Sequence, residues 1–135
     1  MIEITDFRDR LLLTLRAVPM GEDFSVALYG GGRAHVGAVA LALPRPSLAD
    51  PLAGSATASV LAAPGHKEDL LARELALKLA SELGVTVAVA CGIHLDAATE
   101  TEIREVRSLA LEMAESLTAE IRLLRQPSSR APGEP

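Results

Sequence analysis

The sequence predicts one α+β domain, in which two helices cover one face of a single, mostly antiparallel sheet. Two observations lead to this fold class. Short apolar segments separated by turn residues fill the first half of the chain, which is typical of strands. A helical period then replaces them, and a short β-branched segment separates two helical stretches. The expected order is ββββ-α-β-α with about five strands, in a domain that covers residues 1–125.

The first half of the chain offers a series of strand candidates. They cover residues 10–18, 24–30, 35–43 and 56–63. The turn residues PMGED follow the first candidate, a triple glycine ends the second, and a loop over residues 44–55 begins at Pro44. Because so few residues separate most neighbouring candidates, we expect them to pair as antiparallel hairpins.

The second half of the chain begins with a helix and a strand. Leucines recur at every fourth position within residues 66–83, which predicts a helix with one apolar face, and Gly84 is a typical residue for its C-terminal end. On the opposite face, Glu74 and Lys78 are spaced for an ion pair. The segment VTVAVA, residues 85–90, predicts a buried strand bounded by glycines.

A capping box predicts where the last helix begins. Thr99 and Glu102 have the spacing at which each side chain satisfies a free backbone amide of the other. An apolar stripe continues from there to about Arg125, and a helix of that length measures roughly 39 Å. Part of so long a helix is available to pack on a second subunit. Residues 126–135 are rich in Pro, Ser and Gly, which predicts a disordered tail.

The composition excludes several classes of function. The chain has 18 acidic and 13 basic residues, two Phe, one Tyr and no Trp, a balance that argues against nucleic-acid binding. Its single cysteine, Cys91, excludes an intrachain disulfide and a four-cysteine zinc site and fits a reducing compartment. No signal-peptide core and no bilayer-spanning apolar run is present. We therefore expect a soluble, cytoplasmic protein without a nucleic-acid or membrane partner.

The three histidines of the chain all lie at joints between predicted elements. His35 precedes a strand candidate, His66 begins the first helix, and His94 follows the buried strand. Tracking the direction of each element places all three joints at the same end of the sheet. If strands 56–63 and 85–90 are neighbours in a right-handed crossover, two of these joints are adjacent.

This end of the predicted sheet also suits an anion. The amino end of a helix offers free N–H groups, Lys67 and Arg33 add positive charge, and Gly31 and Gly32 permit close approach of the backbone. A bland explanation exists for each stretch: a glycine-rich turn, a polar first helical turn in which Glu68 complements the helix dipole, and a strand end followed by a turn. The residues alone leave these alternatives open.

Two other functions remain compatible with the same residues. His35, His66 and His94 are suitable zinc ligands, and with Glu68 or Asp96 as base they would make a metal-dependent hydrolase. A zinc deaminase is excluded because its P-C-x-x-C signature needs more than one cysteine. The third possibility is a dimeric protein-assembly module whose polar edge contacts a partner.

Three stretches taken together resemble a known family. GGGRAHVGAVALALP, APGHKEDLLARELA and CGIHLDAATETEI are similar to the pattern of small bacterial prenylated-flavin chaperones associated with UbiD-type aromatic acid decarboxylases, such as those acting on gallate. The resemblance covers roughly residues 10–107. The shared positions are Gly31, Gly32, His35, Gly37, Gly65, His66, Lys67, Glu68, Asp69, Gly92, His94 and Asp96.

The resemblance implies a non-catalytic protein that binds prenylated FMN and assists the maturation of a decarboxylase. It also implies a fold like that of proteasome-assembly chaperones, which form dimers. Lys67 and Arg33 would suit the flavin phosphate, the histidines would hydrogen-bond the ring system, and Tyr29 is the aromatic residue beside the glycines. The expected cofactor-binding residues are Gly31, Gly32, Arg33, His35, Gly65, His66, Lys67, Glu68, His94 and Asp96.

Overall fold

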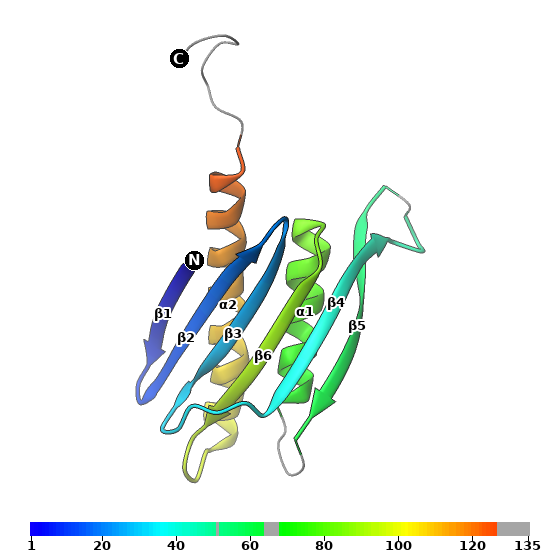
Figure 1. Ribbon diagram of the computed structural model, residues 1–135. Coiled ribbons are helices and arrows are strands. Elements are labelled where there is room, and N and C mark those ends of the chain that lie inside the picture. The colour runs from blue at the N-terminus through cyan, green and yellow to red at the C-terminus, as the bar shows by residue number, and fades with distance from the viewer. Residues whose placement is uncertain (51, 64–67, 127–135) are drawn as a thin grey trace, which may run out of the picture.

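The computed structural model of the protein describes residues 1–50, 52–63 and 68–126. Within them, two helices cover one face of a six-stranded sheet (Figure 1), which confirms the α+β class. The predicted tail lies outside the described residues from position 127 onward. The elements in chain order are β1 (Ile2–Arg8), β2 (Leu11–Met20), β3 (Asp23–Gly31), β4 (Ala38–Pro46), β5 (Gly54–Ala62), α1 (Asp69–Leu83), β6 (Val87–His94) and α2 (Glu100–Leu124).

The strand β1 is not among the expected strands. It pairs antiparallel with β2 from Ile2 opposite Ala17 to Arg8 opposite Leu11. The tight turn between them places Asp9 in the left-handed region, with φ 52°. Only Ile2 and Ile4 give β1 an alternating apolar pattern, and both are half-buried at the sheet edge. So short a pattern is a weak signal for a strand.

The strand β4 begins and ends later than expected, and continues through Pro44. Its pairing with β6 ends at Ala42, which lies opposite Val87, whereas its pairing with β5 continues to Pro46. Beyond Ala42 the strand therefore has one neighbour only. A proline whose missing N–H faces the unpaired side costs no ladder hydrogen bond, so the sheet tolerates it there.

The strand β6 lies between β3 and β4, which corrects two expectations. The order across the sheet is β1-β2-β3-β6-β4-β5, with β6 parallel to β3 and antiparallel to β4. Segments 24–30 and 35–43 are therefore not a hairpin, and β6 is not a neighbour of β5. The sheet is mixed, because the β3–β6 pair is parallel while the other four strand pairs are antiparallel as expected. In the strand VAVACGIH, Val87, Val89 and Cys91 are fully buried on the helix side, and the small Ala88 and Ala90 lie on the other face.

Each helix packs on its own part of the sheet. α1 contacts β4, β5 and β6, while α2 contacts β1 and β2. The inner face of β4 and the buried face of α1 are both built largely from alanine, which lets this helix approach the sheet closely. These alanines are Ala38, Ala40, Ala42, Ala72, Ala76 and Ala80. None of the helices in the described part of the chain is long and apolar enough to span a membrane.

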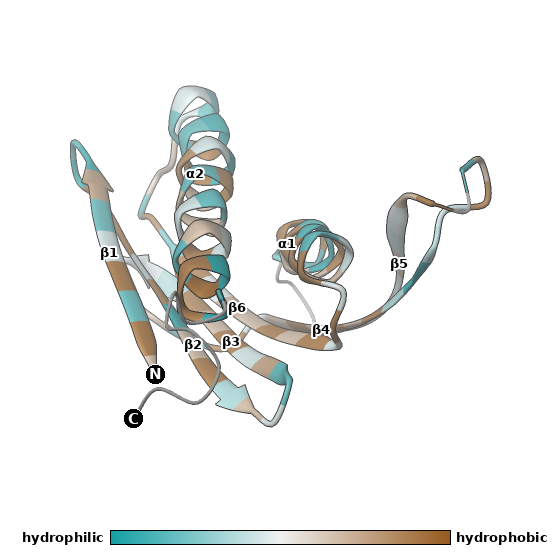
Figure 2. Cartoon of the chain, turned by 90° about the horizontal axis from the view of Figure 1, so that it is seen from above, coloured by the Kyte–Doolittle hydropathy of each residue, from teal (hydrophilic) through white to brown (hydrophobic). Residues whose placement is uncertain are grey.

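The opposite face of the sheet is not covered by either helix. Figure 2 shows both helices on the concave side of the curved sheet. The outward side chains include aliphatic residues that are 40% to 80% exposed, with small alanines between them. We call this surface the open face, and its exposed aliphatic residues are Leu12, Val18, Val39, Leu41, Leu43 and Leu61.

The predicted capping box begins α2 and is tied to the turn between β1 and β2. The Thr99 hydroxyl accepts from the Glu102 amide, and the Glu102 carboxylate accepts from the Thr99 amide, each at 3.1 Å. The Arg10 Nε donates to the same carboxylate at 2.6 Å. The Arg10 hydrogen bond, followed by the Thr99 amide, lowers the pKa of Glu102 to about 2.

We expect this carboxylate to contribute to acid stability. Because its folded-state pKa of about 2 lies below the ordinary value of 4.5, its stabilisation is full above pH 4.5 and is lost as the pH falls toward 2. Glu102→Gln should lower the Tm at neutral pH and flatten the fall in Tm across that window. Thermal unfolding followed by circular dichroism checks this. The control is Glu100→Gln in the same helical turn; equal pH profiles for the two variants would contradict the assignment.

Candidate functional site

The segment between β3 and β4 crosses the end of β6. It must do so because β6 lies between the two strands that the segment connects. The Gly32 amide donates to the His94 carbonyl at 2.7 Å, and the Gly37 amide donates to the Cys91 carbonyl at 2.9 Å. The crossing segment is thus hydrogen-bonded to β6 at two places near the end of that strand, Cys91 and His94.

Glycines make this crossing possible. A Cβ on Gly92 would lie 1.5 Å from the His35 carbonyl oxygen, and a Cβ on Gly31, whose φ is +74°, would lie 2.2 Å from the His94 oxygen. A Cβ on Gly37 would lie 2.6 Å from the carboxylate of Glu68. Gly31 and Gly37 of the first stretch and Gly92 of the third therefore allow the stretches to pack closely, because a side chain at these positions would clash. The Gly32 amide, at the glycines expected to permit close approach of the backbone to an anion, donates to the backbone of β6.

His35 and Glu68 form the most buried polar pair of the site. His35 lies on the crossing segment, and Glu68 immediately precedes α1. The His35 Nε2 is 2.8 Å from Glu68 Oε1, and their side chains are 20% and 13% exposed. The same carboxylate oxygen accepts from the Ile93 amide at 3.4 Å. Glu68 thus joins the start of α1, the end of β6 and the crossing segment.

His94 carries a second, more exposed pair. Its Nε2 is 2.8 Å from Asp96 Oδ1, with side chains that are 41% and 92% exposed. The expected convergence of His35 and His94 at one end of the sheet is confirmed, because both line the same pocket. Gly65, His66 and Lys67 lie outside the described residues. Within the described ranges, no three His, Cys, Asp or Glu side chains are grouped so that they could hold a metal ion.

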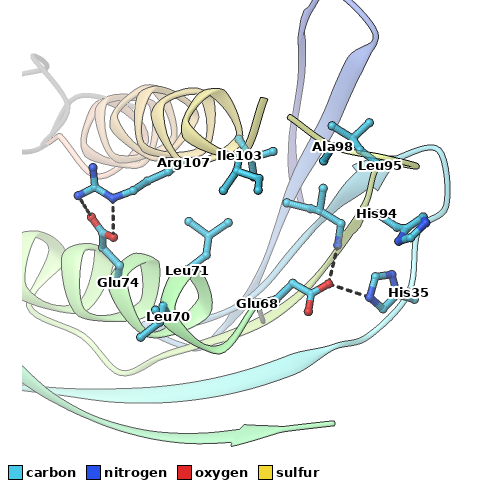
Figure 3. A pocket seen from close by; sticks show the side chains of 12 residues that line it. His35, Glu68, Leu70, Leu71, Glu74, His94, Leu95, Ala98, Ile103 and Arg107 are labelled. Atoms are coloured by element: carbon cyan, nitrogen blue, oxygen red, sulfur yellow. Dashed lines mark hydrogen bonds and ion pairs between the residues drawn. The ribbon is translucent and has the colours of Figure 1, made fainter. Parts of the chain in front are cut away.

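A pocket of about 520 Å³ opens between the first turns of α1 and α2 and the end of β6. Figure 3 shows the His35–Glu68 pair at one end and the Glu74–Arg107 pair at the other. Aliphatic side chains form the wall between them: Leu71, Ile93, Leu95, Ala98, Ile103 and Val106. Helical periodicity assigns several of these positions to the core, so the sequence offers no signal that separates pocket wall from core.

A further ion pair, between Glu74 of α1 and Arg107 of α2, joins the two helices. The Arg107 Nε donates to Glu74 Oε2 at 3.0 Å, and this carboxylate raises the pKa of Arg107. The expected pair of Glu74 with Lys78 does not form, since Lys78 instead lies 2.8 Å from Glu82. Tertiary contact with α2 decides the partner of Glu74.

Two further expected residues lie away from the pocket. Arg33 is exposed on the crossing segment and does not line the pocket. Tyr29 follows the fully buried Leu28, so its side chain points to the open face. The pocket lies on the helix-covered face, and Tyr29 therefore cannot stack on a ring inside it.

The fold and site define a small α+β protein with a ligand-sized pocket at one end of its sheet. A family model described as prenylated flavin chaperone LpdD-like domain matches residues 8–122, and the chain belongs to that family. No curated protein matches the chain. The resemblance in the three sequence stretches is thereby confirmed.

The close approach at Gly92 predicts a large effect of one methyl group. Gly92→Ala should lower the free energy of unfolding by about 2 kcal/mol or more, because the new Cβ meets backbone that cannot move aside. Gly32→Ala is the matched control, since its Cβ would meet nothing nearer than 3.8 Å. Urea unfolding of both variants measures the difference. Equal stability of the two would refute the packing role of Gly92.

The cysteine in the third stretch should be unreactive. Burial, and secondarily the negative charge of Glu68, raises the pKa of the Cys91 thiol to about 12. A thiol-reactive dye at neutral pH should label the unfolded chain rapidly and the native protein at a rate limited by unfolding. Rapid stoichiometric labelling of the native protein would show that the thiol is accessible.

Proposed function

We propose that this protein is a non-catalytic carrier that binds prenylated FMN and assists the maturation of a UbiD-type aromatic acid decarboxylase. Membership of the prenylated flavin chaperone family supports the chaperone role. The observation that carries the proposal further is the convergence of residues from the three signature stretches on one pocket. His35, Glu68 and His94 each come from a different stretch, and all three line it.

In this proposal the polar end of the pocket holds the ligand by hydrogen bonds. His35 and Glu68 position each other at 2.8 Å, and His35 Nδ1 also lies 3.3 Å from the Arg33 carbonyl oxygen, so a polar group of the ligand would bind by sharing or exchanging these hydrogen bonds. Asp96 orients His94 through the second pair. Gly31 and Gly32 contribute by holding the crossing segment against β6 rather than by touching the ligand.

The phosphate of the ligand is assigned to Arg33, which lies outside the pocket. Arg33 is exposed on the crossing segment and forms no ion pair with another side chain of the described ranges. By resemblance to the family, Gly65, His66 and Lys67 belong to the same binding set. A protein of this kind would act in the cytoplasm beside the decarboxylase, without nucleic acid.

We further propose that two copies of the chain pair through the open face. Exposed aliphatic residues over β4 and β5 are costly to leave in water. The whole open face, across all six strands, has about 20 outward-pointing residues. At spacings of about 4.8 Å across strands and about 6.8 Å along them, these residues cover roughly 650 Å². This area approaches the roughly 800 Å² that each partner contributes to a standard interface. On this face Arg16 and Glu3 form an ion pair at 3.0 Å, so their charges neutralise each other.

The dimer has a direct test. Leu41, 45% exposed at the middle of β4, should tolerate Glu in an isolated subunit but not in an apolar interface. Leu41→Glu should weaken self-association at least tenfold, measured by sedimentation equilibrium. Leu48→Glu makes the same change at a leucine that is 91% exposed in a loop. A monomeric wild-type protein, or a Leu41→Glu variant that dimerises normally, would remove this proposal.

Ligand binding is tested by titration. Purified protein should change the absorbance and fluorescence of reduced prenylated FMN on binding, and the loaded protein should increase the yield of active decarboxylase from apoenzyme. His35→Ala should weaken binding about tenfold, the effect of losing about 1.4 kcal/mol. Arg45→Ala, on the part of β4 beyond its pairing with β6, serves as control. No binding together with no gain of decarboxylase activity would refute the carrier function.

A further inference from the structure

Most of the residues that line the pocket are aliphatic, and only one end of it carries the His35–Glu68 and His94–Asp96 pairs. Its rim carries Leu70 on α1 and Ile103 on α2, which are 74% and 60% exposed. Figure 3 shows Leu71 and Ile103 between the two polar ends of the pocket. Large aliphatic groups on both sides of a concave pocket favour an apolar occupant, because its binding removes their surface from water.

The charges around the pocket disfavour a phosphate inside it. Glu68 and Glu74 both line the pocket, and the lining cation Arg107 is bonded to Glu74. A phosphate dianion placed here would lose its hydration and face two carboxylates. The charged end of a nucleotide-like ligand therefore stays outside this pocket.

The described wall of the pocket contains no Phe, Tyr or Trp side chain, since Tyr29 points to the open face, and its rings are the imidazoles of His35 and His94 at the polar end. The aliphatic part of the wall therefore offers no ring to stack on a flavin. Aliphatic walls instead recognise a ligand by the apolar surface that they cover, and each buried methylene-sized group raises affinity about fourfold. The volume of about 520 Å³ lies in the usual range for pockets that take a small molecule.

We propose that this pocket takes the apolar, prenyl-derived edge of the flavin, and that its aliphatic walls select prenylated over unmodified FMN. The inference rests on the proposed carrier function and adds which part of the ligand enters. Leu71, Ala98 and Val106 act as specificity-determining residues. The His35–Glu68 pair meets the polar edge of the ring system next to them.

Filling the pocket tests this assignment. Ala98→Leu adds bulk to the wall, and we expect it to weaken binding of reduced prenylated FMN at least tenfold while changing the affinity for reduced FMN less than twofold. Leu71→Ala, which removes wall contacts, should weaken the prenylated ligand several-fold and again leave FMN unchanged. Both affinities are measured by the flavin's own absorbance and by calorimetry, with the full-length protein.

The controls separate failure of this inference from failure of the carrier function. Ala119→Leu makes the same change at an exposed position of α2 and should bind as wild type. Circular dichroism melting confirms that each variant folds. If the wild-type protein binds neither flavin, the carrier function itself is wrong. If it binds both flavins equally, or if both pocket variants keep the wild-type preference for the prenylated ligand, flavin binding stands and the pocket assignment is overturned.

Discussion

The position of β6 between β3 and β4 is the constraint on which the rest of this structure depends. Because β6 separates two strands that are consecutive in the chain, the segment joining them must cross its end. That crossing leaves no room for a Cβ at Gly31, Gly37 or Gly92. It also brings His35 against Glu68, which joins the start of α1 to the same end of the sheet. Strand order thus creates the site.

The composition of the core explains why a pocket and an open face coexist with this site. Alanine on β4 and on the facing side of α1 lets that helix lie close to the sheet, while α2 packs over β1 and β2. Between the N-terminal parts of the two helices and the end of β6, aliphatic side chains line a pocket. The outward residues of the sheet, among them Leu41 and Leu43, are left for another surface to cover.

Electrostatics divide the site into a polar end and an apolar wall. The Glu68 side chain, at the start of α1, faces the His35 ring and the Ile93 amide and makes no cap hydrogen bond to the helix. Glu74 and Arg107 neutralise each other across the helices. A ligand with one polar edge and one apolar edge would match this division of the pocket.

The sequence by itself determined the class of the fold, both helices, the capping box of Thr99 and Glu102, and the convergence of His35 and His94. These follow from local periodicity and from the alternating direction of successive elements. Only the tertiary structure decided that β6 lies beside β4, that β1 completes the sheet, and that Glu74 pairs with Arg107 rather than Lys78. Strand order and ion-pair partners are contacts between distant segments. The pocket wall was equally hidden, because Leu71 and Val106 have the same periodicity whether a helix packs on its neighbour or stands away from it.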